Sequence, residues 1–117
     1  MHRTRDLIVW QKAMDLAVAT YGLTSKFPAS ENYRLVSQIT RAVASVPANI
    51  AEGNARGTKR DYANFLAIAR GSLMETETLI MLAIRLQYVT PEQATHTLNL
   101  VTEVSKILTA LRSRLNE

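Results

Sequence analysis

The residue types that most often carry out catalysis are scarce in this sequence. It has no cysteine and only two histidines, His2 and His96, and Glu92 precedes His96 by four positions. Without cysteine, the chain offers neither a thiolate nucleophile nor a thiolate zinc site. A di-iron bundle needs Glu-x-x-His on each of two helices, whereas the Glu92–His96 pair is one residue too widely spaced and has no counterpart. We therefore predict a protein that is not an enzyme and that uses no metal or cofactor.

Residues 53–59 superficially resemble a phosphate-binding loop. A Walker loop needs four residues between its glycines and a lysine directly after the second one. Here the glycines are one residue too close and a threonine intervenes before the lysine, which excludes nucleotide hydrolysis of this class. Arg56, Lys59 and Arg60 can still hold a backbone phosphate beside the N–H groups that open the next helix. The alternative is an exposed, solvated cluster of charges.

The chain is mildly basic. It has 14 lysines and arginines against 10 acidic residues, a net charge of +4. Such an excess permits binding to nucleic acid or to another acidic partner without requiring it, the alternative being a solvated basic surface. The candidate nucleic-acid contacts are Arg41, Arg56, Lys59, Arg60 and Arg70.

A polar stripe at helical spacing surrounds one of these arginines, Arg41. If the stripe faces a neighbouring helix, Arg41 can pair with Glu75 or Glu77 through a two-pronged hydrogen bond. Otherwise the stripe faces water. The predicted polar network comprises Arg41, Ser45, Asn49, Glu52, Ser72 and Glu75.

Hydrophobic periodicity places all of these residues on helices. Apolar residues recur every three to four positions within residues 7–26, 31–55, 58–87 and 90–115, the pattern of amphipathic helices. The connections between them are short. The sequence therefore predicts an all-α, antiparallel up-and-down four-helix bundle that forms a single domain over residues 1–117.

Several residues mark where these helices begin or bend. Ser30 and Thr58 are the expected N-caps of the second and third helices. The segment 90–93, Thr-Pro-Glu-Gln, offers a capping box with proline in the first helical turn. Pro47 lacks an N–H group, so either the second helix kinks there or two shorter helices meet. Both stripes keep their phase across Pro47, which favours the kink.

The third helix carries more apolar residues than one bundle core needs. Surplus apolar surface usually has a second burial partner, so we expect self-association. No apolar run is long enough to span a bilayer and no secretory signal is evident, so we expect a cytoplasmic protein without a membrane partner. The surplus residues are Ile68, Met74, Met81 and Leu82.

Stretches of the first three predicted helices resemble the four-helix-bundle proteins encoded by intervening sequences of 23S ribosomal RNA genes. They read DLIVWQKA over residues 6–13, SVPANIAEG over 45–53 and FLAIARGSLME over 65–75. The sequence departs from the family pattern at Thr40, where arginine is common, and at Arg34, where glycine is common. The departure at Thr40 weakens any charge patch carried over from the family.

The resemblance implies an antiparallel bundle that assembles into a ring-like homopentamer, and it transfers no catalytic residue. Related proteins are accessory variability determinants of diversity-generating retroelements, which bind nucleic acid and engage a reverse transcriptase. We therefore expect an oligomer that binds RNA, or a nucleic-acid–protein complex with a reverse-transcriptase-type partner, through a basic surface. The alternative is a protein-interaction scaffold that binds no nucleic acid. A small-molecule enzyme is the third and least favoured class.

Overall fold

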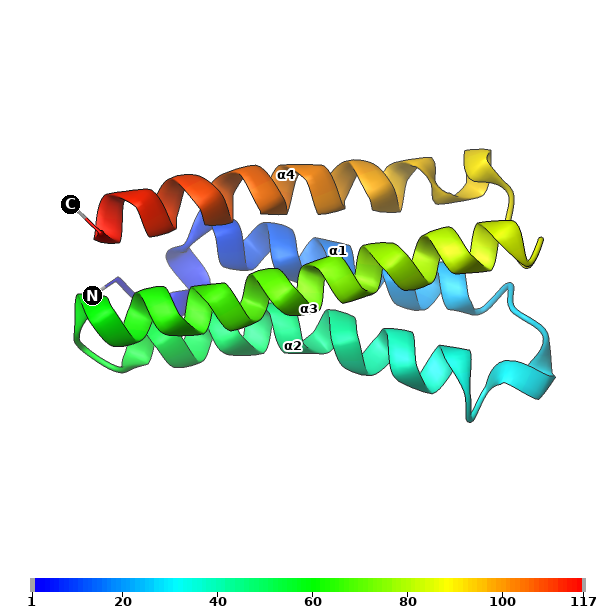
Figure 1. Cartoon of the computed structure of the whole chain (residues 1–117), viewed down its shortest axis with the longest axis horizontal. Coiled ribbons are helices and arrows are strands. Elements are labelled where there is room, and N and C mark those ends of the chain that lie inside the picture. Colours follow the sequence, from blue (N-terminus) through cyan, green and yellow to red (C-terminus); the bar gives the residue numbers. More distant parts are fainter. Residues whose placement is uncertain (1, 117) are drawn as a thin grey trace.

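A computed structural model describes residues 2–116, which form four antiparallel α-helices (Figure 1). Each helix packs against the next one, and the last returns to pack against the first. The bundle measures 44 × 24 × 20 Å. The predicted up-and-down four-helix bundle is thereby confirmed. The helices are α1 (Ile8–Thr24), α2 (Leu35–Ala55), α3 (Lys59–Arg85) and α4 (Pro91–Leu115), with 3-10 turns at Thr4–Asp6 and Ala29–Glu31.

The apolar core has two parts, one after the other along the bundle. Buried apolar side chains from all four helices meet in both, and burying a valine, leucine or isoleucine side chain stabilises the fold by about 1.5–3 kcal/mol. Two buried threonines fit this core because their hydroxyls donate to helix carbonyls, Thr20 to Leu16 and Thr76 to Ser72, both at 2.8 Å. The first part includes Leu16, Val46, Ile50, Leu66, Leu73 and Leu108, and the second includes Leu23, Phe27, Ile39, Ile80 and Val89.

The second helix is continuous but begins later than predicted. Pro47 lies inside α2, so one helix rather than two spans this part of the chain. The expected N-cap, Ser30, instead lies in a 3-10 turn, and Arg34 occupies the N-cap position of α2. At this turn the largely buried Glu31 carboxylate accepts from the Tyr88 hydroxyl at 3.4 Å and pairs with Arg34 at 3.5 Å. These contacts hold the chain in a turn before α2 starts.

The other two predicted helix starts agree with the structure. The Thr58 hydroxyl accepts a hydrogen bond from the Asp61 backbone N–H at the start of α3. Thr90 and Gln93 form a complete capping box at the start of α4, with Pro91 in its first turn. Both helices therefore begin where local side chains satisfy the first free N–H groups.

Gly53 allows α2 and α3 to approach closely near the turn that joins them. A Cβ atom added there would lie 2.8 Å from the Phe65 Cβ and 3.1 Å from the Tyr62 Cδ1. Real Cβ atoms essentially never come within 3.0 Å of such a neighbour. By contrast, a Cβ added at Gly71, in the middle of α3, would meet nothing within 4 Å.

These two glycines give opposite expectations for substitution by alanine. Gly53→Ala should lower the free energy of unfolding by about 1–3 kcal/mol, because the new methyl group overpacks the α2–α3 contact. The matched variant Gly71→Ala should raise it by up to about 1 kcal/mol, since alanine favours the helix over glycine. Urea denaturation of both variants measures the difference. Equal stabilities would contradict the close approach at Gly53.

Candidate nucleic-acid interface

Three segments that are distant in the sequence meet at one end of the bundle. Residues 2–7 and the last turn of α4 lie at the same end of the bundle as the turn between α2 and α3 (Figure 1). The Asn54 side chain donates to the His2 carbonyl and to the Thr4 hydroxyl, which ties the N-terminal segment to the end of α2. Tyr62 and Arg114 line one pocket together with His2, so the ends of α3 and α4 meet there as well. We call residues 2–7, 52–61 and 112–116 the basic end.

The basic end holds nearly all of the net charge of the described chain. Within residues 2–116 it contains seven arginines and lysines but only three carboxylates, those of Asp6, Glu52 and Asp61. The rest of these residues carry seven cations against six carboxylates and are almost neutral. The charge excess is therefore a local feature of one end. Its cations are Arg3, Arg5, Arg56, Lys59, Arg60, Arg112 and Arg114.

Local contacts hold Arg56 in place without neutralising the surface. Its guanidinium pairs with Glu52 at 3.2 Å and lies 4.8 Å above the centre of the Phe65 ring. The side chain remains 49% exposed, and exposed ion pairs of this kind contribute little energy. Lys59 and Arg60, on the first turn of α3, are exposed as well. A phosphate can therefore compete for this group of cations.

The structure brings together only part of the predicted set of nucleic-acid contacts. Arg56, Lys59 and Arg60 lie at one turn. Arg41 lies about 22 Å back along α2 from Arg56, and Arg70 about 15 Å along α3 from Arg60, at 1.5 Å per residue; both are exposed. Sequence reasoning missed Arg3, Arg5, Arg112 and Arg114 as members of the same surface. The predicted topology was enough to group these arginines with Arg56, because an up-and-down bundle of four helices places both chain ends at the same end as its second connection.

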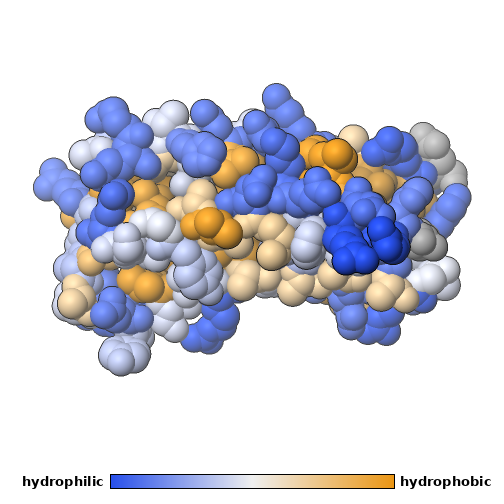
Figure 2. All heavy atoms as spheres, turned by 180° about the vertical axis from the view of Figure 1, so that it is seen from behind, coloured by the Kyte–Doolittle hydropathy of each residue, from blue (hydrophilic) through white to orange (hydrophobic). Residues whose placement is uncertain are grey.

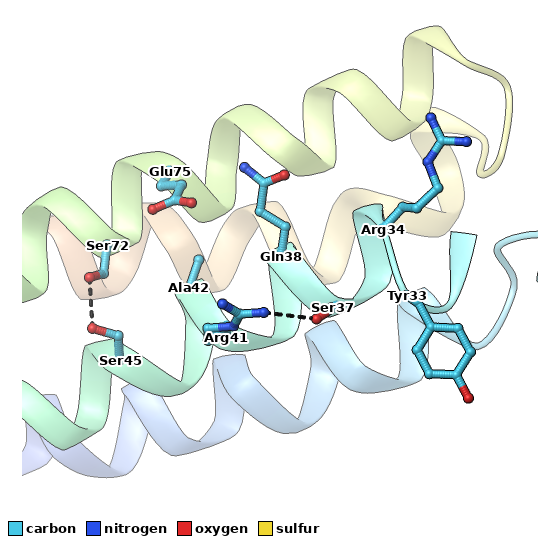
Figure 3. A pocket seen from close by; sticks show the side chains of 9 residues that line it. All are labelled: Tyr33, Arg34, Ser37, Gln38, Arg41, Ala42, Ser45, Ser72 and Glu75. Atoms are coloured by element: carbon cyan, nitrogen blue, oxygen red, sulfur yellow. Dashed lines mark hydrogen bonds between the residues drawn. The ribbon is translucent and has the colours of Figure 1, made fainter. Parts of the chain in front are cut away.

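A polar groove of about 520 Å³ lies between α2 and α3, outside the basic end (Figure 3). Part of the predicted polar network forms its inner end. The Ser45 and Ser72 hydroxyls are 2.8 Å apart, and the Asn49 amide donates to the Ser45 carbonyl and hydroxyl, also at 2.8 Å. The groove is lined by Tyr33, Arg34, Ser37, Gln38, Arg41, Ala42, Ser45, Ser72 and Glu75.

The charged members of the predicted network are arranged differently from the expectation. Arg41 donates to the Ser37 hydroxyl at 3.1 Å, one turn earlier on the same helix, and forms no ion pair with a glutamate of residues 2–116. Glu75 lies across the groove on α3 (Figure 3). Glu52 pairs with Arg56 at the basic end. The stripe on α2 therefore borders an open groove between α2 and α3.

An apolar face runs along α1 and α2 on the side of the molecule opposite to that of Figure 1. Apolar side chains gather along the middle of this side between hydrophilic borders (Figure 2). Val18 is 73% exposed, and Met14 and Tyr21 are exposed beside it. A groove of about 350 Å³ between the two helices is lined by apolar residues alone. We call this set the apolar face: Trp10, Met14, Ala17, Val18 and Tyr21 on α1, and Ala44, Pro47, Ala48 and Ala51 on α2.

The surplus apolar residues predicted on α3 are also largely exposed. Ile68, Met81 and Leu82 are exposed, whereas Met74 packs partly against the core. Sequence reasoning did not single out the apolar face, although Trp10 and Tyr21 lie within the predicted first helix, residues 7–26. In the bundle these side chains lie beside the core rather than inside it.

Metal sites and membrane spans are not found among the described residues. Within residues 2–116, no three side chains of histidine, cysteine, aspartate or glutamate gather where they could hold a metal ion. No helix of that range has the length and hydrophobicity needed to cross a bilayer.

Comparisons with known proteins place the chain among bundles of similar size. A family model described as 23S rRNA-intervening sequence protein matches residues 5–110. A crystal structure from Bacteroides thetaiotaomicron, of a protein with unknown function from the S23 ribosomal protein family, is 30% identical. The match covers 90% of this chain and 98% of that chain with a TM-score of 0.80. No curated protein matches the chain.

A tyrosine that directly follows the α3 segment of the basic end has an ionisation that can be tested. Tyr62 is 3% exposed, and its hydroxyl has no hydrogen-bond partner within residues 2–116. Burial raises the pKa of Tyr62 above its ordinary value of 10.0. The unfolded chain therefore loses this proton first as the pH rises, so folding stability should fall between pH 10.0 and the higher folded pKa.

Tyr62→Phe should remove that part of the pH dependence. At pH 7 the variant should be as stable as the parent or slightly more stable, because the hydroxyl that it deletes is buried and unsatisfied. Above pH 10 it should lose less stability than the parent. Urea denaturation at both pH values measures this. An identical alkaline loss in the two proteins would show that Tyr62 ionises as freely when folded as when unfolded.

Proposed function

The chain belongs to the 23S rRNA-intervening sequence protein family, and from this membership and its surface we propose a non-enzymatic homo-oligomer that binds RNA. The binding surface is the basic end, either on RNA alone or on a nucleic-acid–protein complex such as one with a reverse-transcriptase-type partner. The observation that carries this proposal is the concentration of the net positive charge at that end. We place the protein in the cytoplasm, where RNA is available.

The chemistry of the basic end suits a phosphate backbone. Six of its seven cations are arginines. Five of them are exposed, whereas Arg112 is partly exposed and its Nε is buried. Planar guanidinium groups bind phosphate oxygens with two parallel hydrogen bonds. Backbone contacts of this kind supply most non-specific affinity for nucleic acids. They require neither a deep pocket nor a titrating base. The surface therefore supports binding rather than catalysis.

Self-association would strengthen this binding. A ring with cyclic symmetry presents the same surface of every copy at one side, so a pentamer would display the basic end five times. Binding through several linked copies raises the apparent affinity without any new contact. The modest charge of one chain would become a large local field.

The apolar face supports self-association. Contiguous exposed apolar side chains with a hydrophilic border are typical of contact sites in soluble proteins. Small alanines on α2 allow another helix to come close, and Trp10 and Met14 offer large side chains to bury. A second copy of the chain is the occupant that we propose. If a different protein covers this face instead, the chain acts as a scaffold.

The RNA proposal predicts a specific effect of removing charge. Changing Arg56, Lys59 and Arg60 together to alanine should weaken binding to a ribosomal RNA hairpin at least tenfold. It should also reduce the slope of log affinity against log salt by about 2–3, because each lost phosphate contact accounts for nearly one unit. Fluorescence polarisation at several salt concentrations measures both quantities.

A matched triple variant controls for the loss of net charge. Lys26, Arg85 and Lys106 are exposed cations that lie outside the basic end. Replacing all three by alanine should change the affinity and the salt slope much less. Equal losses in the two triple variants would remove the basic end as the interface. A parent protein that binds no RNA at low salt would contradict the proposed function itself.

The oligomer proposal predicts that one charge on the apolar face dissociates the assembly. Sedimentation equilibrium of the parent should give about five times the chain mass of 13.0 kDa. Val18→Glu should give the mass of a single chain with unchanged helix content, because Val18 is already exposed in the isolated bundle. Thr102→Glu, on the exposed side of α4, is the control and should leave the assembly intact. A parent protein that sediments as a single chain at micromolar concentration would refute self-association.

A further inference from the structure

The side chain of Tyr33 is almost completely exposed, so it is available to a partner and adds little to the core. Tyr33 is 95% exposed, compared with 73% for Val18, the next most exposed large apolar or aromatic side chain within residues 2–116. It precedes α2 and lies at the outer end of the polar groove, with its ring directed away from the bundle (Figure 3). A free aromatic ring is a platform on which an unpaired base can stack.

Two arginines line the groove at whose outer end Tyr33 lies. The Arg34 side chain is 79% exposed, pairs with Glu31 at 3.5 Å and points away from the Tyr33 ring (Figure 3). Arg41 lies two helical turns further on and is held beside the groove by its hydrogen bond to Ser37. The α2 helix begins here without a side-chain cap, so its positive dipole end faces the same region. Arg41 and the start of α2 suit a phosphate inside the groove, next to the nucleotide whose base stacks on Tyr33.

The inner part of the groove has a different character. Gln38 and Glu75 line it from opposite helices, and the Ser45–Ser72 pair closes it (Figure 3). The Glu75 carboxylate repels phosphate but accepts hydrogen bonds from the amino group of a base. The Gln38 amide can both donate and accept. This part of the groove therefore suits the edge of a base rather than the backbone.

We infer that the groove between α2 and α3 binds a single-stranded segment of RNA, which specifies the kind of RNA bound under the proposed function and rests on it. One base stacks on Tyr33. The adjoining phosphate lies by Arg41, and the next base directs its edge toward Gln38 and Glu75. Paired bases are stacked inside a duplex and cannot reach such a platform. The groove thus distinguishes unpaired RNA from duplex RNA, whereas the basic end does not.

Affinity for single strands and duplexes tests this inference. The probes are a fluorescein-labelled oligocytidine of about ten nucleotides and a blunt RNA duplex. Tyr33→Ala should weaken binding of the oligocytidine about tenfold, as expected for the loss of one stacked base. Tyr33→Phe, which keeps the ring, should stay within about twofold of the parent. Duplex affinity should not change in either variant.

The charged groups of the groove give a second test. Arg41→Ala should weaken binding of the oligocytidine more than Lys26→Ala does, since Lys26 is exposed but lies outside the groove. The parent should prefer oligocytidine to oligouridine, because cytosine offers an amino group to Glu75 and uracil does not. Glu75→Gln should reduce this preference.

The outcomes separate the groove from the wider proposal. If Tyr33→Ala leaves the affinity for oligocytidine unchanged while the Arg56, Lys59 and Arg60 triple variant still loses RNA binding, the groove inference is wrong and the proposed function stands. If Tyr33→Phe loses as much affinity as Tyr33→Ala, the ring does not stack and the inference is again wrong. A variant that changes only the sedimentation mass would assign Tyr33 to a protein contact instead. If the parent binds neither probe at low salt, both proposals fail.

Discussion

The close antiparallel contact between α2 and α3 is the constraint on which the rest of the molecule depends. Gly53 permits it at one end, where any larger residue would meet Phe65 and Tyr62. The Ser45–Ser72 hydrogen bond continues it further along the pair. The turn that joins the two helices carries Arg56, and the groove between them opens beyond Ser45. This pair of helices thus provides the whole groove and three of the seven cations of the basic end.

The fold was largely predictable from the sequence, because its signals are local. Apolar residues at helical spacing and threonine caps at Thr58 and Thr90 act within a few residues of one another. The start of α2 was not predictable in this way. It depends on the contact of Glu31 with Tyr88, 57 positions away, and a local pattern such as that of Ser30 carries no information about so distant a partner.

The candidate sites were only partly predictable, for the same physical reason. Arg56, Lys59 and Arg60 are adjacent in the sequence, so their grouping was evident. Arg3 and Arg114 join them only through the topology of the bundle. The side-chain partner of Arg41 depends on the exact distance between two helix surfaces, and it is Ser37 rather than a glutamate. The exposure of Tyr33 likewise follows from the turn that delays α2.

The attachment of the N-terminal segment by Asn54 has a practical consequence for anyone who handles the protein. The carbonyl of His2 and the hydroxyl of Thr4 are held against the end of α2, and the last turn of α4 lies beside them. A purification tag or fluorescent fusion at either terminus would therefore lie next to the arginines of the basic end and shield them from solvent. A label carried by the loop between α3 and α4 would protrude from the far side and leave those arginines accessible.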